Sequence, residues 1–325
     1  MPTGRDRLTR PKPLKPGDAI AIAAPAGRIA QEGMAYLERA VSVIEQMGFR
    51  VKAIPNPNFD HPYLAGEDPG RARELMTFFT DPEIRGILCA RGGYGSQRII
   101  PLLNSQVIRE NPKIFIGSSD ITALLAYLLE ECQLVAFHGP NVATKQFLEG
   151  DTRRTLASFR SALLQGIPGE TPACKALKRG IGKGRVKGGC LSLLVATIGT
   201  TYEIDLRGTV LFVEDLNEPP YRIDRMLTHL RHAGKLDQIE GLVFGEMASC
   251  RDAQGTDLEA MVLDLFQDQN VPILFGFPSG HGRTNLSIPL GVEVIVDGYR
   301  GHLIFSEEGV SSEEYGSKGN GGQGR

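Results

Sequence analysis

The sequence of 325 residues contains no tryptophan, no excess of charge and no hydrophobic run long enough to cross a bilayer. Its 36 Lys and Arg residues nearly balance its 38 Asp and Glu residues, so the formal net charge is only −2. Such a chain lacks the basic field that nucleic acid requires. A membrane-spanning helix needs about 20 consecutive apolar residues, and the apolar runs here are all shorter. We therefore expect a small-molecule ligand, with no nucleic acid and no membrane as partner.

Cysteine is also scarce, and none of the five cysteines has the C-x-x-C spacing of metal-binding or redox motifs. They are Cys89, Cys132, Cys174, Cys190 and Cys250. An odd number of scattered cysteines in mostly apolar surroundings indicates reduced thiols. We therefore expect a cytoplasmic location.

The first apolar run follows a basic N-terminal stretch and superficially resembles a secretion signal. Asp18 directly precedes this run, which ends early at Pro25. Both features are unfavourable in a signal sequence. We interpret the run as a buried first strand.

In the first half of the chain, short apolar runs alternate with segments of helical periodicity. Expected strands cover residues 19–24, 50–54, 86–89 and 114–116, and expected helices cover residues 37–47, 71–79, 97–103 and 121–129. This alternation predicts an α/β fold with a parallel, flavodoxin-like sheet and helices on both faces. Ligands of such sheets bind beyond the carboxyl ends of the strands.

The length of the chain suits two domains. We expect an N-terminal α/β domain over residues 14–145 and a C-terminal mixed α/β, β-rich domain over residues 186–308. Between them, glycines and prolines weaken the pattern, so residues 146–185 are interpreted as an interdomain linker. The polar, Gly-rich end of the chain, residues 309–325, is predicted to be disordered.

The segment 113–129 is the most informative part of the sequence. An apolar strand runs into Gly117 and turns through a Ser-Ser-Asp run into a helix. A strand, tight turn and helix in this order can present a serine hydroxyl at the top of a sheet, so Ser119 is the candidate nucleophile. The same residues also suit an ordinary helix N-cap, in which Asp120 caps the helix without any chemistry.

A serine hydroxyl needs an adjacent base in order to act near neutral pH. His138 and His281 each follow a strand and lie beside glycine, so either could be that base, or neither. The carboxylate that orients the base should lie at a rigid strand end. Glu214 has this position, and Asp215 and Glu218 compete for the role. Each could equally be a solvated carboxylate before a helix.

Four further motifs accompany the GSSD turn. They are CARGGYGSQRI at residues 89–99, FHGP at 137–140, LFVEDLNEPPYRIDRML at 211–227 and GFPSGHGRTNLSIPLG at 276–291. In this order and spacing they resemble the LD-carboxypeptidase family of serine peptidases. That family comprises the murein tetrapeptide carboxypeptidases and the microcin C immunity peptidases. The resemblance extends from about residue 14 to about residue 306.

The resemblance implies particular roles for several residues. The implied catalytic triad is Ser119, Glu214 and His281. The implied oxyanion hole consists of the backbone amides of Gly93 and Asp120, where glycine permits close approach of the backbone to a substrate.

The resemblance also implies the surroundings of the substrate. Residues expected beside the substrate are Arg91, Gly92, Tyr94 and His138. Neither a metal nor an organic cofactor is implied. The chain departs from the family at Cys190, where asparagine is common.

The implied activity is that of a serine LD-carboxypeptidase, which removes the terminal D-alanine from murein tetrapeptide through an acyl-enzyme. One alternative is an immunity-type peptidase that cleaves peptidyl-adenylate analogues such as microcin C. Relatives of that kind carry an aromatic-rich recognition loop, whereas this chain has no tryptophan. A second alternative is a non-catalytic peptide-binding protein. The resemblance also implies a homodimer.

Overall fold

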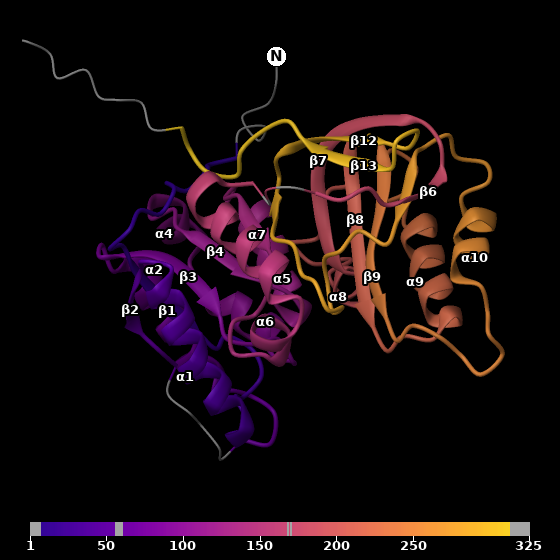
Figure 1. Cartoon of the computed structure of the whole chain (residues 1–325). Helices are drawn as coiled ribbons and strands as arrows, with labels where there is room; N and C mark the ends of the chain where they lie inside the picture. Colours follow the sequence, from indigo (N-terminus) through magenta and orange to yellow (C-terminus); the bar gives the residue numbers. More distant parts are fainter. Residues whose placement is uncertain (1–7, 56–60, 168, 170, 313–325) are drawn as a thin grey trace, which may run out of the picture.

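The computed structural model describes residues 8–55, 61–167, 169 and 171–312. The chain forms two lobes, each built around one β-sheet, that lie side by side (Figure 1). Helix α5 and the long strand β7, whose bounds are given below, lie where the two lobes meet.

The first lobe contains a six-stranded sheet. Its strands are β1 (Ala19–Ala23), β2 (Arg50–Ala53), β3 (Ile84–Cys89), β4 (Ile114–Gly117), β5 (Ala136–His138) and β11 (Ile288–Leu290). They follow the order β11-β5-β4-β3-β1-β2, in which β1 to β5 are mutually parallel and β11 pairs antiparallel with β5. The order 2-1-3-4-5 is that of flavodoxin-like sheets, so the predicted fold of this lobe is confirmed.

Helices cover both faces of this sheet. They are α1 (Gln31–Gln46), α2 (Asp68–Thr80), α3 (Ser96–Ile99), η1 (Ile100–Leu102), α4 (Ser105–Glu110), η2 (Ser119–Ile121), α5 (Thr122–Glu130), α6 (Lys145–Glu149) and α7 (Thr152–Gln165). All five residues of β1 are buried, as expected for a parallel strand covered on both sides. The first eight residues of α5 are buried all round, because this helix is enclosed between the two lobes.

The second lobe contains a seven-stranded sheet. Its strands are β6 (Lys175–Lys178), β7 (Ile181–Cys190), β8 (Thr209–Leu216), β9 (Gly241–Ala248), β10 (Ile273–Phe275), β12 (Glu293–Asp297) and β13 (His302–Phe305). Strands β7 to β10 are parallel, whereas β6, β12 and β13 pair antiparallel, so the predicted mixed α/β character is confirmed. The helices of this lobe are α8 (Leu191–Ala196), α9 (Pro220–His232) and α10 (Leu258–Leu265).

The segment 146–185, interpreted from the sequence as a linker, is regular structure. It contains most of α6, the whole of α7 and β6, and half of β7. Phe147 and Phe159 on the two helices are fully buried in the first lobe, with ring centroids 5.2 Å apart. These elements are hard to recognise in the sequence because α6 is one turn long and because glycines interrupt the apolar pattern of β7.

The predicted disordered tail is partly fixed to the first lobe. Val310 is buried against the core residues of α7, and the Gly309 amide donates a hydrogen bond to the Gly166 carbonyl at 2.7 Å. The burial of one apolar residue and the hydrogen bond to the carbonyl that ends α7 therefore fix this part of a polar segment. The rest of the predicted tail, residues 313–325, lies outside the described residues.

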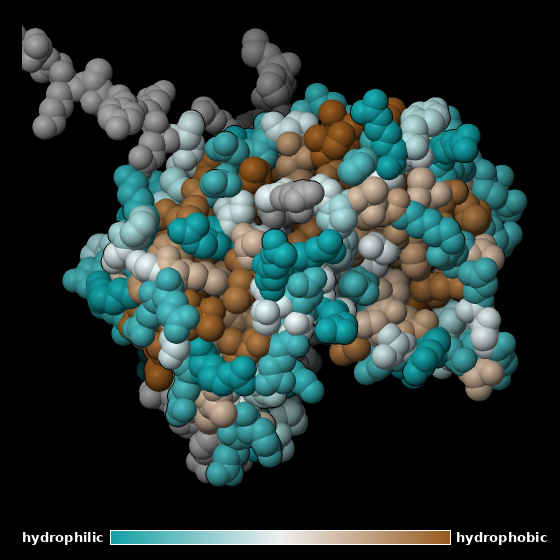
Figure 2. All heavy atoms as spheres, in the orientation of Figure 1, coloured by the Kyte–Doolittle hydropathy of each residue, from teal (hydrophilic) through white to brown (hydrophobic). Residues whose placement is uncertain are grey.

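Among the residues that the structure describes, no helix is both long and apolar enough to cross a membrane. Figure 2 shows hydrophilic and hydrophobic residues interspersed over both lobes on one face.

Candidate active site

The turn after β4 places its two serines in different environments. Ser118 is buried, and its hydroxyl accepts a hydrogen bond from the Asn141 side chain at 3.3 Å. Ser119 is partly exposed while both of its neighbours are buried. Its φ of 64° lies in the left-handed region, which a non-glycine residue rarely adopts outside functional sites. The backbone therefore presents Ser119, as a nucleophile elbow does.

The Gly-Gly turn after β3 packs directly on this serine. A Cβ atom on Gly92 would lie 2.6 Å from Ser119 Cβ and 3.3 Å from the backbone nitrogen of Asp120. Glycine is therefore required at this position by close approach. The Gly92 carbonyl accepts a hydrogen bond from the Gly27 amide at 3.0 Å, which fixes the turn against the loop after β1. The structure thus packs Gly92, the neighbour of Gly93, against the turn that contains Ser119 and Asp120. Gly93 and Asp120 are the two residues predicted to form the oxyanion hole.

The side chain of Asp120 ties the serine turn to the start of α3. Its carboxylate accepts a hydrogen bond from the Ser96 amide at 2.8 Å, and the Ser96 hydroxyl donates to the Asp120 carbonyl at 2.6 Å. Burial raises the pKa of Asp120, and the hydrogen bonds from Ser96 oppose that shift. Asp120 thus holds the two turns of the predicted oxyanion hole together and does not serve only as a helix cap.

Arg71 is a buried residue of α2 that the sequence analysis missed. Its guanidinium donates hydrogen bonds to the backbone carbonyls of Gly66, Gly95 and Pro25, and it pairs with Asp68. Three loops at the carboxyl edge of the sheet are therefore joined through one side chain. No sequence motif could have revealed it, because a single arginine in a helix is usually solvated.

Glu214 and His281 form a hydrogen-bonded pair at the carboxyl end of β8. His281 Nδ1 lies 2.6 Å from Glu214 Oε2. The carboxylate is fully buried, whereas 20% of the histidine side chain is exposed. This arrangement fixes the ring and leaves its other nitrogen available for proton transfer.

The electrostatics of the pair follow from burial and from mutual contact. Burial alone would lower the pKa of His281, but the hydrogen bond and the charge of Glu214 outweigh burial and raise this pKa. Burial raises the pKa of Glu214, and the hydrogen bond from His281 opposes that shift. The Glu214 carboxylate therefore stabilises the protonated form of the His281 imidazole. A general base takes this form when it accepts a proton from the nucleophile.

The two competing carboxylates have other partners. Asp215 is buried and accepts a hydrogen bond from the Ser192 amide at 2.8 Å, so it holds the start of α8. Glu218 lies on the surface side of the turn and pairs with Arg222 at 3.5 Å. Of the three acidic residues weighed from the sequence, only Glu214 contacts a histidine.

The elements that carry Ser119 and Glu214 come from different lobes and touch each other. The Cys190 amide at the end of β7 donates a hydrogen bond to Thr122 Oγ1 at the start of α5, at 3.1 Å. Cys190 is also the residue of β7 that pairs with Glu214 of β8. Among the described residues, Ser119 and His281 form no hydrogen bond with each other. Such a bond is often long or absent without substrate, because catalytic contacts tighten when the substrate binds.

The remaining predicted site residues differ in accessibility. Arg91 donates to the Arg28 carbonyl at 2.7 Å, and Tyr94 is half exposed, with its ring 5.9 Å from that of Tyr63. His138 lies inside the β5 strand and is completely buried, with its ring edge-on to Phe212 at 5.1 Å. Burial, aided by the nearby charge of His281, lowers the pKa of His138 to about 3.

The burial of His138 corrects its expected role. A residue with no exposed surface cannot touch a substrate while this packing persists. The expectation of contact came from the family resemblance. In the structure, β11 pairs with β5 at His138, and the Phe212 ring packs against the imidazole.

Comparison with known proteins identifies the architecture that carries this site. Profiles of the LD-carboxypeptidase N-terminal domain and C-terminal domain match residues 20–139 and 183–296. The chain belongs to the LD-carboxypeptidase family. The family predicted from the sequence motifs is thereby confirmed.

Several members of the LD-carboxypeptidase family align over most of their length. A probable murein peptide carboxypeptidase of Bacillus subtilis is 35% identical over 93% of this chain and 95% of the relative. The murein tetrapeptide carboxypeptidase of Pseudomonas aeruginosa is 31% identical over 86% of this chain and 94% of the relative. The microcin C7 self-immunity protein MccF of Escherichia coli is 25% identical over 93% and 97%.

Solved structures share the fold of this LD-carboxypeptidase. A structure of muramoyltetrapeptide carboxypeptidase from Oxalobacter formigenes has a TM-score of 0.79 at 30% identity, covering 88% of this chain and 97% of that chain. A structure of MccF in complex with glutamyl sulfamoyl guanosine has a TM-score of 0.86 at 24% identity, covering 93% and 99%. At that identity, the second likeness concerns the fold alone.

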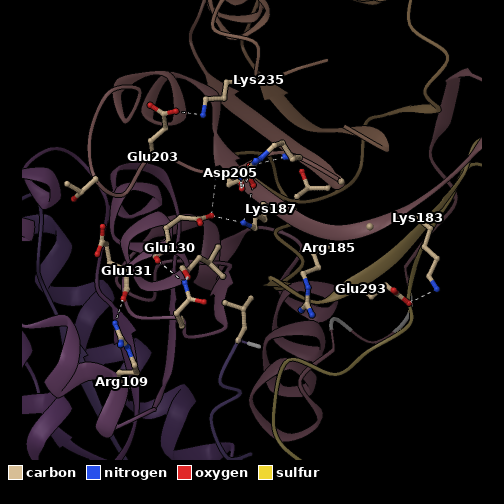
Figure 3. A pocket seen from close by; sticks show the side chains of 18 residues that line it. Arg109, Glu130, Glu131, Lys183, Arg185, Lys187, Glu203, Asp205, Lys235 and Glu293 are labelled. Carbon is tan, nitrogen blue, oxygen red and sulfur yellow. Dashed lines mark hydrogen bonds and ion pairs between the residues drawn. The ribbon is translucent and has the colours of Figure 1, made fainter. Parts of the chain in front are cut away.

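A large pocket of this LD-carboxypeptidase lies away from the candidate triad. It measures about 1210 Å³ and is lined at the amino ends of β7 and β8, including Arg185 and Thr209, whereas Glu214 lies near the carboxyl end of β8. Figure 3 shows that several of its charged side chains are paired with one another, for example Lys187 with Glu130. In the described ranges, no group of three or more His, Cys, Asp or Glu side chains is placed to hold a metal ion.

Proposed function

We propose that this chain is a serine LD-carboxypeptidase that hydrolyses the L,D-peptide bond to the terminal D-alanine of murein tetrapeptide. The observation that carries the proposal is the 2.6 Å pair of His281 with buried Glu214, on the lobe that packs against the strained Ser119 turn. The names of the relatives from Bacillus subtilis and Pseudomonas aeruginosa support this substrate.

In the proposed mechanism, Ser119 Oγ attacks the carbonyl carbon of the L,D-peptide bond. His281 accepts the hydroxyl proton, and Glu214 stabilises the imidazolium that results. The negative charge that develops on the carbonyl oxygen is stabilised by the amides of Gly93 and Asp120. His281 then protonates the departing amine of D-alanine, which leaves an acyl-enzyme on Ser119. Water, activated by His281, releases the shortened peptide.

The proposal is tested by incubating the purified chain with murein tetrapeptide and measuring free D-alanine. We expect stoichiometric release of D-alanine and tripeptide, and no release by the Ser119→Ala variant. Binding of the peptide without any release would instead indicate the non-catalytic peptide-binding alternative.

The immunity-type alternative is supported by the sequence similarity to the microcin C7 self-immunity protein MccF. It is tested in parallel with a peptidyl sulfamoyl adenylate as substrate. We expect murein tetrapeptide to be the better substrate by kcat/KM, because this chain lacks tryptophan for an aromatic recognition loop. A preference for the adenylate would reverse the assignment.

We further propose that the protein acts in the cytoplasm as a homodimer. Free cysteines support the location: the five thiols are unpaired, and four of them are buried. The candidate triad needs the two lobes in a fixed relative position. A symmetric contact between two copies of the chain could restrain both lobes, which supports a homodimer. Light scattering on the purified chain tests the dimer, and a fully active monomer of about 35 kDa would reject it.

A further inference from the structure

The loop that carries His281 lies against helices of the other lobe. It leaves β10 in the second sheet and returns to the first sheet as β11. Along this path, the Asp151 amide donates to the Arg283 carbonyl at 2.7 Å, and Thr155 Oγ1 accepts from the Asn285 amide at 3.2 Å. Ser158 Oγ accepts from the Ser287 amide at 3.0 Å. The start of α7 and the residue before it thus hold the loop against the lobe that contains Ser119.

Gln146 of α6 makes the contacts nearest to the histidine. Its side-chain Nε2 donates hydrogen bonds to the Gly280 carbonyl at 2.7 Å and to the Gly282 carbonyl at 2.6 Å. These two carbonyls flank His281 in the chain. The Gln146 Oε1 atom accepts a hydrogen bond from Asn285 Nδ2 at 3.2 Å, so all hydrogen-bonding groups of this amide face the loop.

Gln146 lies in α6, a short helix whose position is fixed by a cap and by a buried residue. Thr144 Oγ1 caps α6 by accepting a hydrogen bond from the Phe147 amide at 3.3 Å. Phe147, the next residue in the helix, is fully buried with its ring edge-on to that of Phe159. A one-turn helix that is capped and anchored in this way gives the neighbouring glutamine a defined position.

We propose that Gln146 is a positioning residue that holds the His281 backbone in register with Ser119, an inference that rests on the proposed function. The loop needs an external restraint because glycines on both sides of His281 give its backbone unusual freedom. A catalytic geometry tolerates only about 0.5 Å of error. One amide that donates to both flanking carbonyls supplies such a restraint across the two lobes.

The test uses Gln146→Met, which keeps the length of the side chain but removes both donors. The matched control is Gln133→Met, because Gln133 Nε2 also donates to two carbonyls, but to those of Leu129 and Glu130 at the end of α5 and not to those of the His281 loop. With murein tetrapeptide, we expect kcat of Gln146→Met to fall about 10- to 100-fold with KM within about threefold. The control variant should stay within about twofold of the unsubstituted protein in both parameters.

A second readout separates positioning from a general loss of structure. Glu214 and Asp215 on β8 and His138 on β5 act on the His281 ring and are unchanged in the variant. If the ring loosens from Glu214, the acid limb of the kcat/KM profile should move to lower pH in Gln146→Met and stay in place in Gln133→Met. If Gln146→Met does not fold, Gln146→Leu provides the same test, because it also removes both donors and adds no charge that would itself raise the pKa of His281.

The rate at which a fluorophosphonate modifies Ser119 distinguishes failure of this inference from failure of the proposed function. If Ser119 of the unsubstituted protein is not modified, the proposed function itself is wrong. If it is modified, we expect Gln146→Met to react about 10-fold more slowly than Gln133→Met. Modification at the unsubstituted rate, together with unchanged kcat and an unchanged acid limb, would overturn the positioning role.

Discussion

Lys187 of β7 forms an ion pair at 2.7 Å with Glu130 at the end of α5, across the boundary between the two lobes (Figure 3). The same two elements meet again near the candidate triad, where the Cys190 amide donates to Thr122 Oγ1. Both ends of helix α5 are therefore fastened to the C-terminal part of strand β7. Helix α5 begins just after Ser119, so this contact sets the lobe of the nucleophile against that of Glu214.

We expect Lys187→Met to lower the free energy of unfolding by about 2–3 kcal/mol, because the Glu130 charge would remain largely buried without its partner. The control is Lys183→Met on the same strand, since Lys183 pairs with Glu293 at 2.9 Å while 59% of its side chain is exposed. Its loss should cost less than about 1 kcal/mol. Urea unfolding of both variants measures the difference, and equal losses would show that the interlobe pair has no special role.

The two serines of the turn should differ sharply in their effect on catalysis. We expect Ser119→Ala to lower kcat at least about 1,000-fold without loss of folding. Ser118→Ala removes a hydrogen bond to Asn141 and should cost about 1 kcal/mol of stability with less than about tenfold change in kcat. Steady-state kinetics with thermal melts of both variants decide this. The reverse order of activities would mean that the elbow is displaced by one residue.

The acid limb of activity should reflect His281. Since Glu214 raises the pKa of this histidine, kcat/KM should fall as the pH drops through an apparent pKa above 6.5, where the imidazole becomes protonated and can no longer accept the serine proton. Glu214→Gln removes the charge, so its acid limb should move to lower pH while kcat decreases by about 10⁴-fold. An acid limb that stays in place in this variant would assign it to another group.

His138 should make stability depend on pH. The unfolded chain binds a proton on this imidazole below about pH 6.5, whereas the folded protein does so only near pH 3. Between these values the unfolded form holds the extra proton, so the free energy of unfolding should fall on acidification by up to about 1.4 kcal/mol per pH unit. His138→Phe, which keeps a ring against Phe212, should remove this contribution. Parallel pH dependences for the two proteins would contradict it.

Strands β1 to β4 were predictable because their short apolar runs alternate with segments of helical period, whereas β5, β11, α6 and α7 were not expected. The serine turn and Glu214 were candidates from their positions at strand ends, and only the family resemblance chose His281 over His138. Strand β7 was not predictable, because its glycines resemble those of a loop. The structure explains them by close packing, since a Cβ on Gly188 would lie 1.8 Å from the Phe212 carbonyl oxygen.

Residues that act through another residue also escaped the sequence analysis. Arg71, Asn141 and Gln146 bind backbone atoms of turns that are distant in the sequence, so no local pattern marks them. The competing carboxylates Asp215 and Glu218 could be separated from Glu214 only by their contacts. Sequence motifs therefore indicated candidates for the reacting residues, whereas the residues that hold these candidates in place required the fold.

The central claim is that Ser119 is the nucleophile of a hydrolase that releases D-alanine. Its most direct test is to treat the protein with a fluorophosphonate, locate the adduct by peptide mass mapping and follow D-alanine release from murein tetrapeptide in the same sample. The account predicts one phosphonyl group on Ser119 and loss of release in proportion to its occupancy. Full D-alanine release by protein that is completely modified at Ser119, or loss of release with the adduct on another residue, would contradict it.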